Sequence, residues 1–396
     1  MDGVNRLVQT KKALPILFAV MFFVMVGFGI IIPVLPFYAE GIGATPTQLG
    51  LLMAVYSLMQ LLFSPMWGKI SDRIGRKPVI MIGIIGLSLS FFLMAISSQL
   101  WMLFAARIIG GFLSSANMPT VTAYVADITS PEDRGKGMGV VGAAVGLGFV
   151  FGPAIGGIFS EISLSMPFYI SGISSLLTFF IVFFFLKESL PESERQQSTD
   201  SQPSRWQAFS GSLSILYILQ LFVSISLAGL EASFAYFAAQ KVGLNTVQLG
   251  YIFMIMGFTG AIVQGGLLGR LTKKWGEGNV IQIGIIISII GFLLVLLIDD
   301  FTTAAIYLSV FGIGNGLIRP SVSSLLTKRS TVGHGSVTGL LSSFDSFGRI
   351  VGPPLGGWLF AVMMNLPYIV GAILSVIAFI LYRIYAVKSK GMIESK

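Results

Sequence analysis

Five charged side chains fall well inside long apolar stretches of this sequence, where a charge is costly. They are Arg107, Glu231, Arg319, Asp345 and Arg349. Placing a charged side chain in hydrocarbon costs at least ~2.5–3.5 kcal/mol. Residues of this kind usually form ion pairs, carry protons or bind a polar molecule. We therefore take them as the first candidates for a functional site.

Glu231 stands on an apolar helix face, with Leu227, Ala228, Phe234 and Ala235 as neighbours. No residue of that segment can pair with it, and apolar surroundings favour a protonated, neutral carboxyl. When ionised, Glu231 could attract a cation, so that a proton and a cationic molecule would compete for one carboxylate. The alternative is a structural glutamate that is hydrogen-bonded to another helix.

Asp345 and Arg349 are four residues apart, so they can face each other on a helix. At about 1.5 Å per residue, Asp345 lies roughly 14 Å from the cytoplasmic end of its segment, and Arg319 about 10–12 Å from the end of the preceding one. The spacing predicts an intramembrane ion network of these three residues. The alternative is a structural salt bridge that holds the C-terminal half together.

Arg107 lies in the outer third of its segment, at a depth similar to that of Glu231. It could modulate the protonation of Glu231, or it could contact backbone carbonyls within the N-terminal half. Neutral polar candidates for a substrate site are Gln60, Asn117 and Asn315. Flat ligands would suit an aromatic wall, although each candidate taken singly also fits a core or lipid-facing position. These candidates are Phe18, Phe22, Tyr236 and Phe258.

The composition indicates a membrane protein. Of 396 residues, 54% are hydrophobic and only 11% are charged, whereas soluble domains carry about 25% charged residues. There is no cysteine, and His334, which we expect in a cytoplasmic loop, is the single histidine. Disulfides, thiolate chemistry and a His-rich metal site are therefore excluded, and we expect no metal and no cofactor. The first apolar stretch is too long for a cleaved signal peptide, so we expect it to remain as an anchor.

Twelve segments are long and apolar enough to cross a bilayer as helices, which takes about 20 residues each. Residues 187–211 are rich in Ser, Gln, Glu and Pro and are typical of a flexible cytoplasmic linker. We expect an all-α membrane protein of twelve transmembrane helices in two pseudo-symmetric six-helix bundles, residues 1–186 and 212–396. The segments are 13–37, 47–67, 79–98, 100–125, 137–160, 166–186, 212–238, 246–268, 280–298, 302–326, 336–362 and 366–386.

The positions of lysine and arginine set the orientation. If both termini are cytoplasmic, Lys241 is the one basic residue in an external loop. The net charge of +8 is then a topology signal, and a nucleic-acid partner is not expected.

The two halves repeat. Gly148, Gly152-Pro153 and Gly156 in one half recur 200 residues later, and so does Pro167. The loop 68–77 likewise matches 269–278. Parallel repeats of this kind are typical of alternating-access transporters with a substrate site between the halves.

These motifs resemble those of the major facilitator superfamily, and the likeness covers essentially the whole chain. The loop GKISDRIGRK matches the superfamily signature between helices two and three, and it supplies Gly68, Asp72, Arg73, Gly75 and Arg76. Asp127 with Arg134 resembles the element after helix four, and Arg107 resembles the helix-four arginine motif.

The closest likeness is to bacterial twelve-helix drug efflux pumps of the multidrug and tetracycline types. The helix-five motif of drug/proton antiporters is matched by Gly148, Gly152, Pro153 and Gly156, and Pro33 to Pro36 also fit that branch. The loop would then latch the cytoplasmic ends of the halves, with Asp72 at a helix N-terminus, unless it is only a basic cytoplasmic loop. The glycines of span five would serve coupling, or only tight packing, while Pro153 would bend the helix.

The resemblance implies a secondary active transporter that exports amphiphilic, often cationic drugs in exchange for protons, through Glu231. Some of these pumps carry an acid in span ten where this chain has Asn315, so Asp345 could take its place. No GxxxxGK[ST] pattern is present, so we expect neither an ATPase site nor an enzyme. Another cargo (tetracycline, a sugar or a lipid) is the first alternative, and a membrane sensor or channel is the second. We expect a monomer in the bacterial cell membrane, whose partners are a small amphiphilic substrate, protons and lipid.

Overall fold

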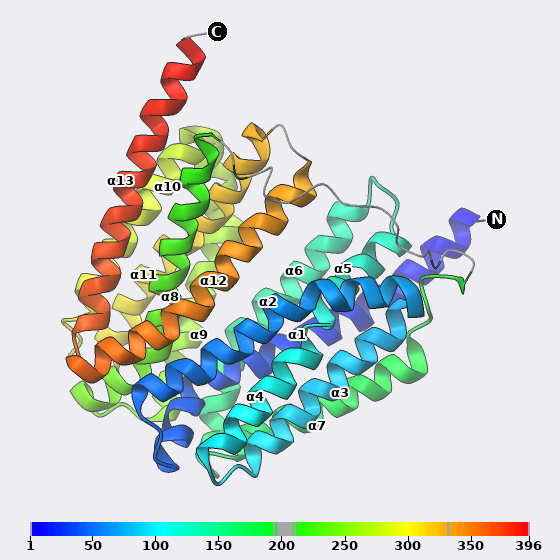
Figure 1. The fold of residues 1–396 in the computed structure, drawn as a ribbon, viewed down its shortest axis with the longest axis horizontal. Helices are drawn as coiled ribbons and strands as arrows, with labels where there is room; N and C mark the ends of the chain where they lie inside the picture. The colour runs from blue at the N-terminus through cyan, green and yellow to red at the C-terminus, as the bar shows by residue number, and fades with distance from the viewer. Residues whose placement is uncertain (1, 193–194, 196–208, 210, 331–332, 395–396) are drawn as a thin grey trace. The chain divides into compact units, whose positions relative to one another are not determined.

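The protein is a bundle of long helices joined by short turns (Figure 1). The structure is a computed structural model that describes every residue except 1, 193–194, 196–208, 210, 331–332 and 395–396. Most of the expected linker 187–211 therefore lies outside the described residues.

The helices follow one another along the chain with few intervening residues. In the first half they are α1 (Asp2–Gly41), α2 (Pro46–Ile74), α3 (Arg76–Ala95), α4 (Leu100–Ser114), α5 (Asn117–Ile128), α6 (Arg134–Ser160) and α7 (Met166–Phe185). In the second half they are α8 (Leu213–Val242), α9 (Thr246–Ile262), the π-helical turn η3 (Val263–Leu267), α10 (Leu268–Val295), α11 (Phe301–Arg329), α12 (His334–Val362) and α13 (Leu366–Glu394).

Each of the twelve expected segments is helical over most of its length, which confirms the all-α membrane fold. The expected span 100–125 consists of two helices, α4 and α5, separated at Ser115 and Ala116. By length and hydropathy, ten described helical stretches could cross a membrane, and the 50-residue stretch Thr246–Val295 covers two expected spans. His334 is the first residue of α12, so its expected place in a loop was wrong.

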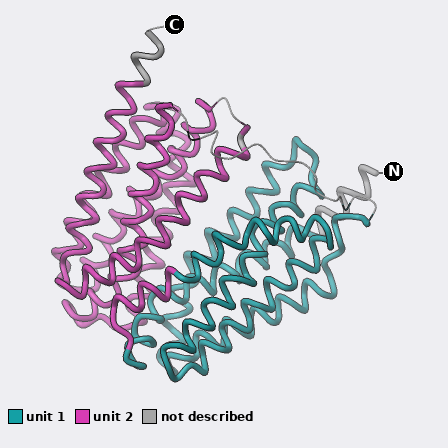
Figure 2. Tube along the Cα trace, viewed as in Figure 1, with its two compact units in different colours: residues 1–43, 55–200 teal, residues 44–54, 201–396 magenta. Residues whose placement is uncertain are grey.

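The chain divides into two compact units (Figure 2). Unit 1 contains residues 1–43 and 55–200, and unit 2 contains residues 44–54 and 201–396. The first turns of α2 belong to unit 2 because they pack on α12, where a Cβ at Gly50 would lie 2.7 Å from the Cα of Pro354.

Helix packing repeats within the units. In unit 1, α1 packs on α6 and α7, and α3 packs on α4 and α7. In unit 2, α8 packs on α12 and α13, and α10 packs on α11 and α13. The two sets correspond helix for helix, which is the structural form of the repeat in the sequence.

Two glycines in the repeated loop motif adopt the same unusual backbone conformation. Gly75 ends the α2–α3 turn with φ 106°, and Gly276 breaks α10 with φ 76°. A positive φ of this kind is readily adopted only by glycine. The loop motif therefore reverses the chain at matching points of the two halves.

The start of α11 shows how a helix begins at the membrane edge. The Asp300 side chain accepts a hydrogen bond from the backbone N–H of Thr303, and the Thr303 hydroxyl accepts one from the backbone N–H of Asp300. This capping box satisfies N–H groups that have no partner within the helix. The Thr303 N–H holds the pKa of Asp300 below its usual value.

Candidate functional site

Glu231 lies deep in unit 2, on α8, where only 3% of the residue is exposed. Its ion partner comes from another helix: Nη1 of Arg349, on α12, is 3.7 Å from Oε2 of Glu231. A buried carboxylate needs such a partner because burial removes the hydration of its charge. The contact is long for a hydrogen bond, so this pairing is looser than the one at Asp345.

Asp345 is held by three groups. Gln220 Nε2 and Ser224 Oγ donate hydrogen bonds to Asp345 Oδ1, over 2.8 and 2.7 Å. Arg319 Nη2, from α11, lies 2.6 Å from Asp345 Oδ2. Oδ1 of Asp345 is thus hydrogen-bonded to residues of α8, whereas Oδ2 is held by the ion pair with Arg319 of α11.

Close packing of α8 against α12 makes these contacts possible. A Cβ at Gly352 would lie 2.6 Å from the carbonyl oxygen of Ile225, and one at Gly356 would lie 2.8 Å from the Cα of Gly229. Glycines at this spacing let two helix backbones approach closely. The short Ser224 and Asp345 side chains can then meet across the seam.

The two acids and the two arginines differ sharply in exposure. The side chain of Arg319 is 56% exposed and that of Arg349 is 34% exposed. The side chain of Asp345 is 11% exposed and that of Glu231 is 4% exposed. The positive ends of both pairs therefore reach the surface of the protein, while the negative ends lie behind them.

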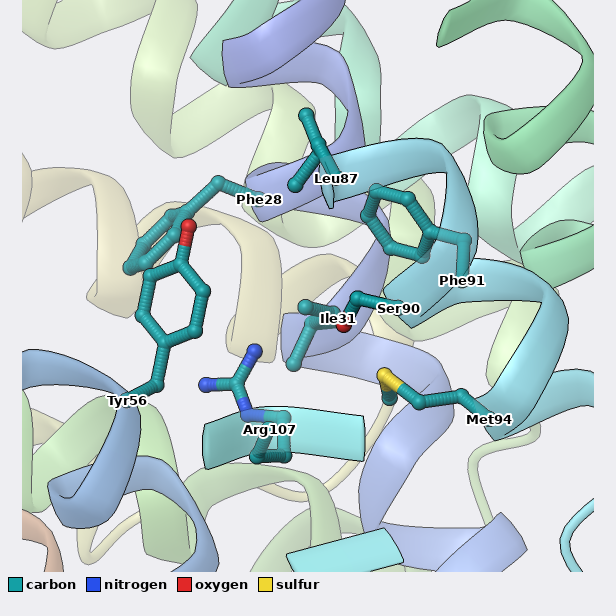
Figure 3. A pocket seen from close by; sticks show the side chains of 8 residues that line it. All are labelled: Phe28, Ile31, Tyr56, Leu87, Ser90, Phe91, Met94 and Arg107. Carbon is teal, nitrogen blue, oxygen red and sulfur yellow. The ribbon is translucent and has the colours of Figure 1, made fainter. Parts of the chain in front are cut away.

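A second buried charge, Arg107 on α4, belongs to unit 1. Its guanidinium carbon lies 4.2 Å from the centre of the Tyr56 ring, an arrangement that stabilises a cation. The tyrosine hydroxyl lies 2.7 Å from Ser114 Oγ, within hydrogen-bond distance. Figure 3 shows the guanidinium directed toward Tyr56 in a small pocket whose other lining residues are Phe28, Ile31, Leu87, Ser90, Phe91 and Met94.

The span-five motif forms the contact between α6 and α1. A Cβ at Gly148 would lie 2.5 Å from the carbonyl oxygen of Phe22, and one at Gly152 would lie 2.7 Å from that of Val26. At Gly156 the corresponding distance to the carbonyl oxygen of Ile30 is 3.0 Å. Pro153 lies inside the same helix. The motif thus packs backbone against backbone, as its repeat in α12 does.

The loop motif forms an ion cluster in unit 1 around Arg76, which is only 8% exposed. Arg76 Nη1 lies 2.5 Å from Asp72 Oδ1, and its Nε lies 3.0 Å from Asp127 Oδ2. Asp72 occupies the last turn of α2. Ser71 accepts a hydrogen bond from Arg76 and donates one to the carbonyl oxygen of Gly68, while Arg73 and Arg134 are exposed.

Glu188, assigned to the linker in the sequence analysis, caps α3. Its two carboxylate oxygens accept the backbone N–H groups of Arg76 and Lys77, over 2.8 and 3.1 Å. A carboxylate is favourable at a helix N-terminus because it meets unpaired N–H groups and the positive end of the helix dipole. Glycine at position 75 supplies no side-chain cap, and this missing cap is the signal that sequence reasoning overlooked.

Unit 2 has an ion pair at the positions that correspond to Arg76 and Asp127, with the acid and the base exchanged. Residues 76 and 127 of unit 1 correspond to residues 277 and 328, in the register that aligns Gly75 with Gly276. There Glu277 binds Lys328. The position keeps an ion pair, but the acid and the base have changed places.

The neutral candidates are divided between the units. Asn117 is 1% exposed, and neither its Nδ2 nor its Oδ1 has a hydrogen-bond partner among the described residues. Gln60 and Asn315 are half-buried. A water molecule is the simplest partner for the amide of Asn117.

The aromatic candidates are divided in the same way. Phe18 stacks on Phe22 in α1, with ring centres 6.1 Å apart, and Tyr236 stacks on Phe360 at 5.9 Å. Phe258, on α9, is 53% exposed. The first pair belongs to unit 1 and the other residues belong to unit 2.

Helical halves that repeat, with charge pairs inside their spans, define a membrane transporter. The model of the Major Facilitator Superfamily matches residues 17–333 and 267–392. The chain belongs to the major facilitator superfamily, a family of transporters rather than enzymes.

The relatives are drug resistance proteins. The chain is 32% identical over 355 residues to Multidrug resistance protein 1 of Bacillus subtilis (strain 168), covering 90% of this chain and 91% of that protein. It is 30% identical over 361 residues to Quinolone resistance protein NorA of Staphylococcus aureus (strain COL), and the match covers 90% of this chain and 92% of that protein. The crystal structure of the nucleoside transporter NupG superposes with a TM-score of 0.78, at 15% identity, over 95% of this chain and 99% of that one. The last likeness is one of fold alone.

Proposed function

We propose that the protein is a drug/proton antiporter that exports amphiphilic, often cationic molecules by alternating access. The observation that carries the proposal is the buried Glu231–Arg349 pair on the seam between α8 and α12. The printed names of the relatives, multidrug resistance and quinolone resistance proteins, support the cargo class.

In this mechanism Glu231 carries the exchanged proton. Its ion contact with Arg349 is long and is the one that the described part of the chain provides, so it is easier to give up than the three contacts of Asp345. When Glu231 is protonated, its ionic attraction for Arg349 is lost, so protonation changes the electrostatics of the seam. Asp345 then acts as a positioning residue for Arg319, and Arg107 adjusts the field in unit 1.

The repeated motifs would serve the conformational change. The glycine seam of Gly148, Gly152 and Gly156 gives α6 a smooth face against α1, and Pro153 weakens one helical hydrogen bond. The cluster of Asp72, Arg76 and Asp127 would be a cytoplasmic latch. Glu188 caps the N-terminus of α3, where Arg76 of this cluster lies. We place the protein in the bacterial cell membrane as a monomer with both termini in the cytoplasm, and we retain bundles 1–186 and 212–396 joined by the linker 187–211.

Substrate-induced proton release tests the proposal directly. Adding a cationic dye to the purified full-length protein in weakly buffered detergent should release protons in a saturable way. Glu231→Gln keeps the size of the side chain but cannot exchange a proton, so release should disappear. Full release from Glu231→Gln would exclude Glu231 as the coupling group and leave Asp345 as the next candidate.

Flux measurements separate the alternatives. An antiporter in vesicles gives saturable, pH-driven drug flux, whereas a channel gives current without saturable coupled flux. A panel that includes tetracycline, a sugar and a lipid analogue identifies another cargo of the same fold.

A further inference from the structure

The exposed arginines of unit 2 point to a particular group on the cargo. We propose that Arg319 binds a carboxylate of the transported molecule, so that amphiphiles bearing a carboxylate are preferred over matched esters. The inference rests on the proposed export function and specifies its substrate class.

The first support is the way Arg319 is presented. Asp345 Oδ2 contacts Nη2 of Arg319, and Asp345 is itself fixed by Gln220 and Ser224. Among the described residues, Asp345 is the only ion-pair partner of Arg319, and 56% of the side chain is exposed. A guanidinium has five N–H donors in a planar fork. Nη2 carries two of them, one on the edge shared with Nε and one on the edge shared with Nη1, so the edge that Asp345 does not use can receive a second planar anion.

The second support is the position of Arg319 along its helix. It precedes the end of α11, at Arg329, by ten residues, or roughly 15 Å of helix. An exposed guanidinium at this depth is strongly disfavoured in contact with lipid and is expected to face a water-filled pathway. Asn315 precedes Arg319 by four residues, so it shares this face of α11.

The third support is the order in which a visiting molecule meets the charges. The carboxylates of Glu231 and Asp345 are 4% and 11% exposed, whereas the side chains of Arg349 and Arg319 are 34% and 56% exposed. A cargo that carries only positive charge meets the arginines before the acids, so a cationic cargo gains from a carboxylate of its own. A carboxylate instead meets a donor fork that matches its geometry and can accept two parallel hydrogen bonds.

Rhodamine B and its ethyl ester make a suitable pair of probes. Both are fluorescent, flat and amphiphilic, and they differ in one free carboxylate. Binding to the purified full-length protein is measured by fluorescence polarisation. The wild type should bind the acid about tenfold more tightly than the ester, the ratio expected for one charge-assisted hydrogen bond.

Two substitutions and a control assign that ratio to Arg319. Arg319→Gln should reduce the ratio of affinities to about one by weakening only the acid. Arg319→Lys keeps the charge without the fork, so it should restore an intermediate ratio. Arg270→Gln, an exposed basic position of the same unit, should keep the wild-type ratio. Because the ratio is measured within one sample, it does not depend on the fraction of folded protein.

The outcomes separate this inference from the function on which it rests. Equal binding of the two dyes by the wild type would overturn the carboxylate site and leave drug export standing. If Arg319→Gln weakens both dyes by the same factor, Arg319 has only a structural role and the inference is wrong. Failure of both dyes to bind at all would contradict the inference and the proposed function together.

Discussion

Arg349 on α12 reaches Glu231 on α8: its Nη1 lies 3.7 Å from Oε2 of the glutamate. The acid is almost completely covered, while a third of the arginine side chain is exposed. Water can therefore compensate the arginine if the pair is broken, but it cannot compensate the glutamate. This asymmetry leads to the first prediction.

Arg349→Gln should destabilise the protein more than Glu231→Gln. Removing the arginine leaves a buried charge without its ion partner, a change that costs about 3–5 kcal/mol in fully buried pairs and less here because the arginine is partly exposed. The double variant should recover much of the loss, since it removes both charges. Thermal unfolding in detergent measures the effect, with Arg270→Gln as the control. Strictly additive losses would show that the two residues are not coupled.

Asp345→Asn should leave most of the proton release intact. Oδ1 of Asp345 accepts hydrogen bonds from Gln220 and Ser224, and Oδ2 forms an ion pair with Arg319, so our proposal gives this residue a positioning role. The variant should instead weaken thermal stability, and Ser224→Ala should do the same to a smaller extent. Loss of proton release as complete as in Glu231→Gln would mean that Asp345 is a coupling residue in its own right.

The sequence was sufficient for the family and the fold, because long apolar segments and the 68–77 motif are both local features. The partners of the buried charges were not local. The spacing of Asp345 and Arg349 indicated that they share a face of one helix. The contact of Arg349 with Glu231 depends on how far α12 is rotated against α8, and no spacing encodes that rotation.

Two contributors were missed although their signals were present. Gln220 and Ser224 occupy the same face of α8 as Glu231, because Gln220 precedes Ser224 by four residues and Ser224 precedes Glu231 by seven. They carry no charge, so the sequence analysis did not select them. Glu188 follows an apolar helix at the start of a polar stretch, so it was assigned to the linker. Its role as the cap of α3 depends on a turn more than 100 residues earlier in the chain.

Gly152→Ala should be damaging, and Gly146→Ala on the same helix should be harmless. A methyl group at Gly152 would lie 2.7 Å from the carbonyl oxygen of Val26, whereas one at Gly146 meets nothing within 4 Å. Overpacking typically costs 1–3 kcal/mol, and glycine to alanine at an open helical position gains up to about 1 kcal/mol. Unfolding temperature and initial transport rate give the comparison. Equal tolerance of the two variants would refute the close seam.

Single cysteines should establish the orientation, because the chain contains none. Ser98 is exposed in the turn between α3 and α4, and Ser130 is exposed between α5 and α6. A membrane-impermeant maleimide should label Ser98→Cys in intact cells, and Ser130→Cys only after the cells are permeabilised. The reverse pattern would place both termini outside.

The exchanged ion pairs, Arg76 with Asp127 and Glu277 with Lys328, bear on how the two halves diverged. If both arose by duplication of one ancestral half, one copy reversed both signs while keeping the pair. No single substitution achieves this, and every direct intermediate sets two like charges together or leaves one charge alone. On that assumption, the ion pair of one half was weakened for a time while the pair of the other half stayed intact. An ancestor with a single copy of the half would have had no second pair to hold its fold during that change.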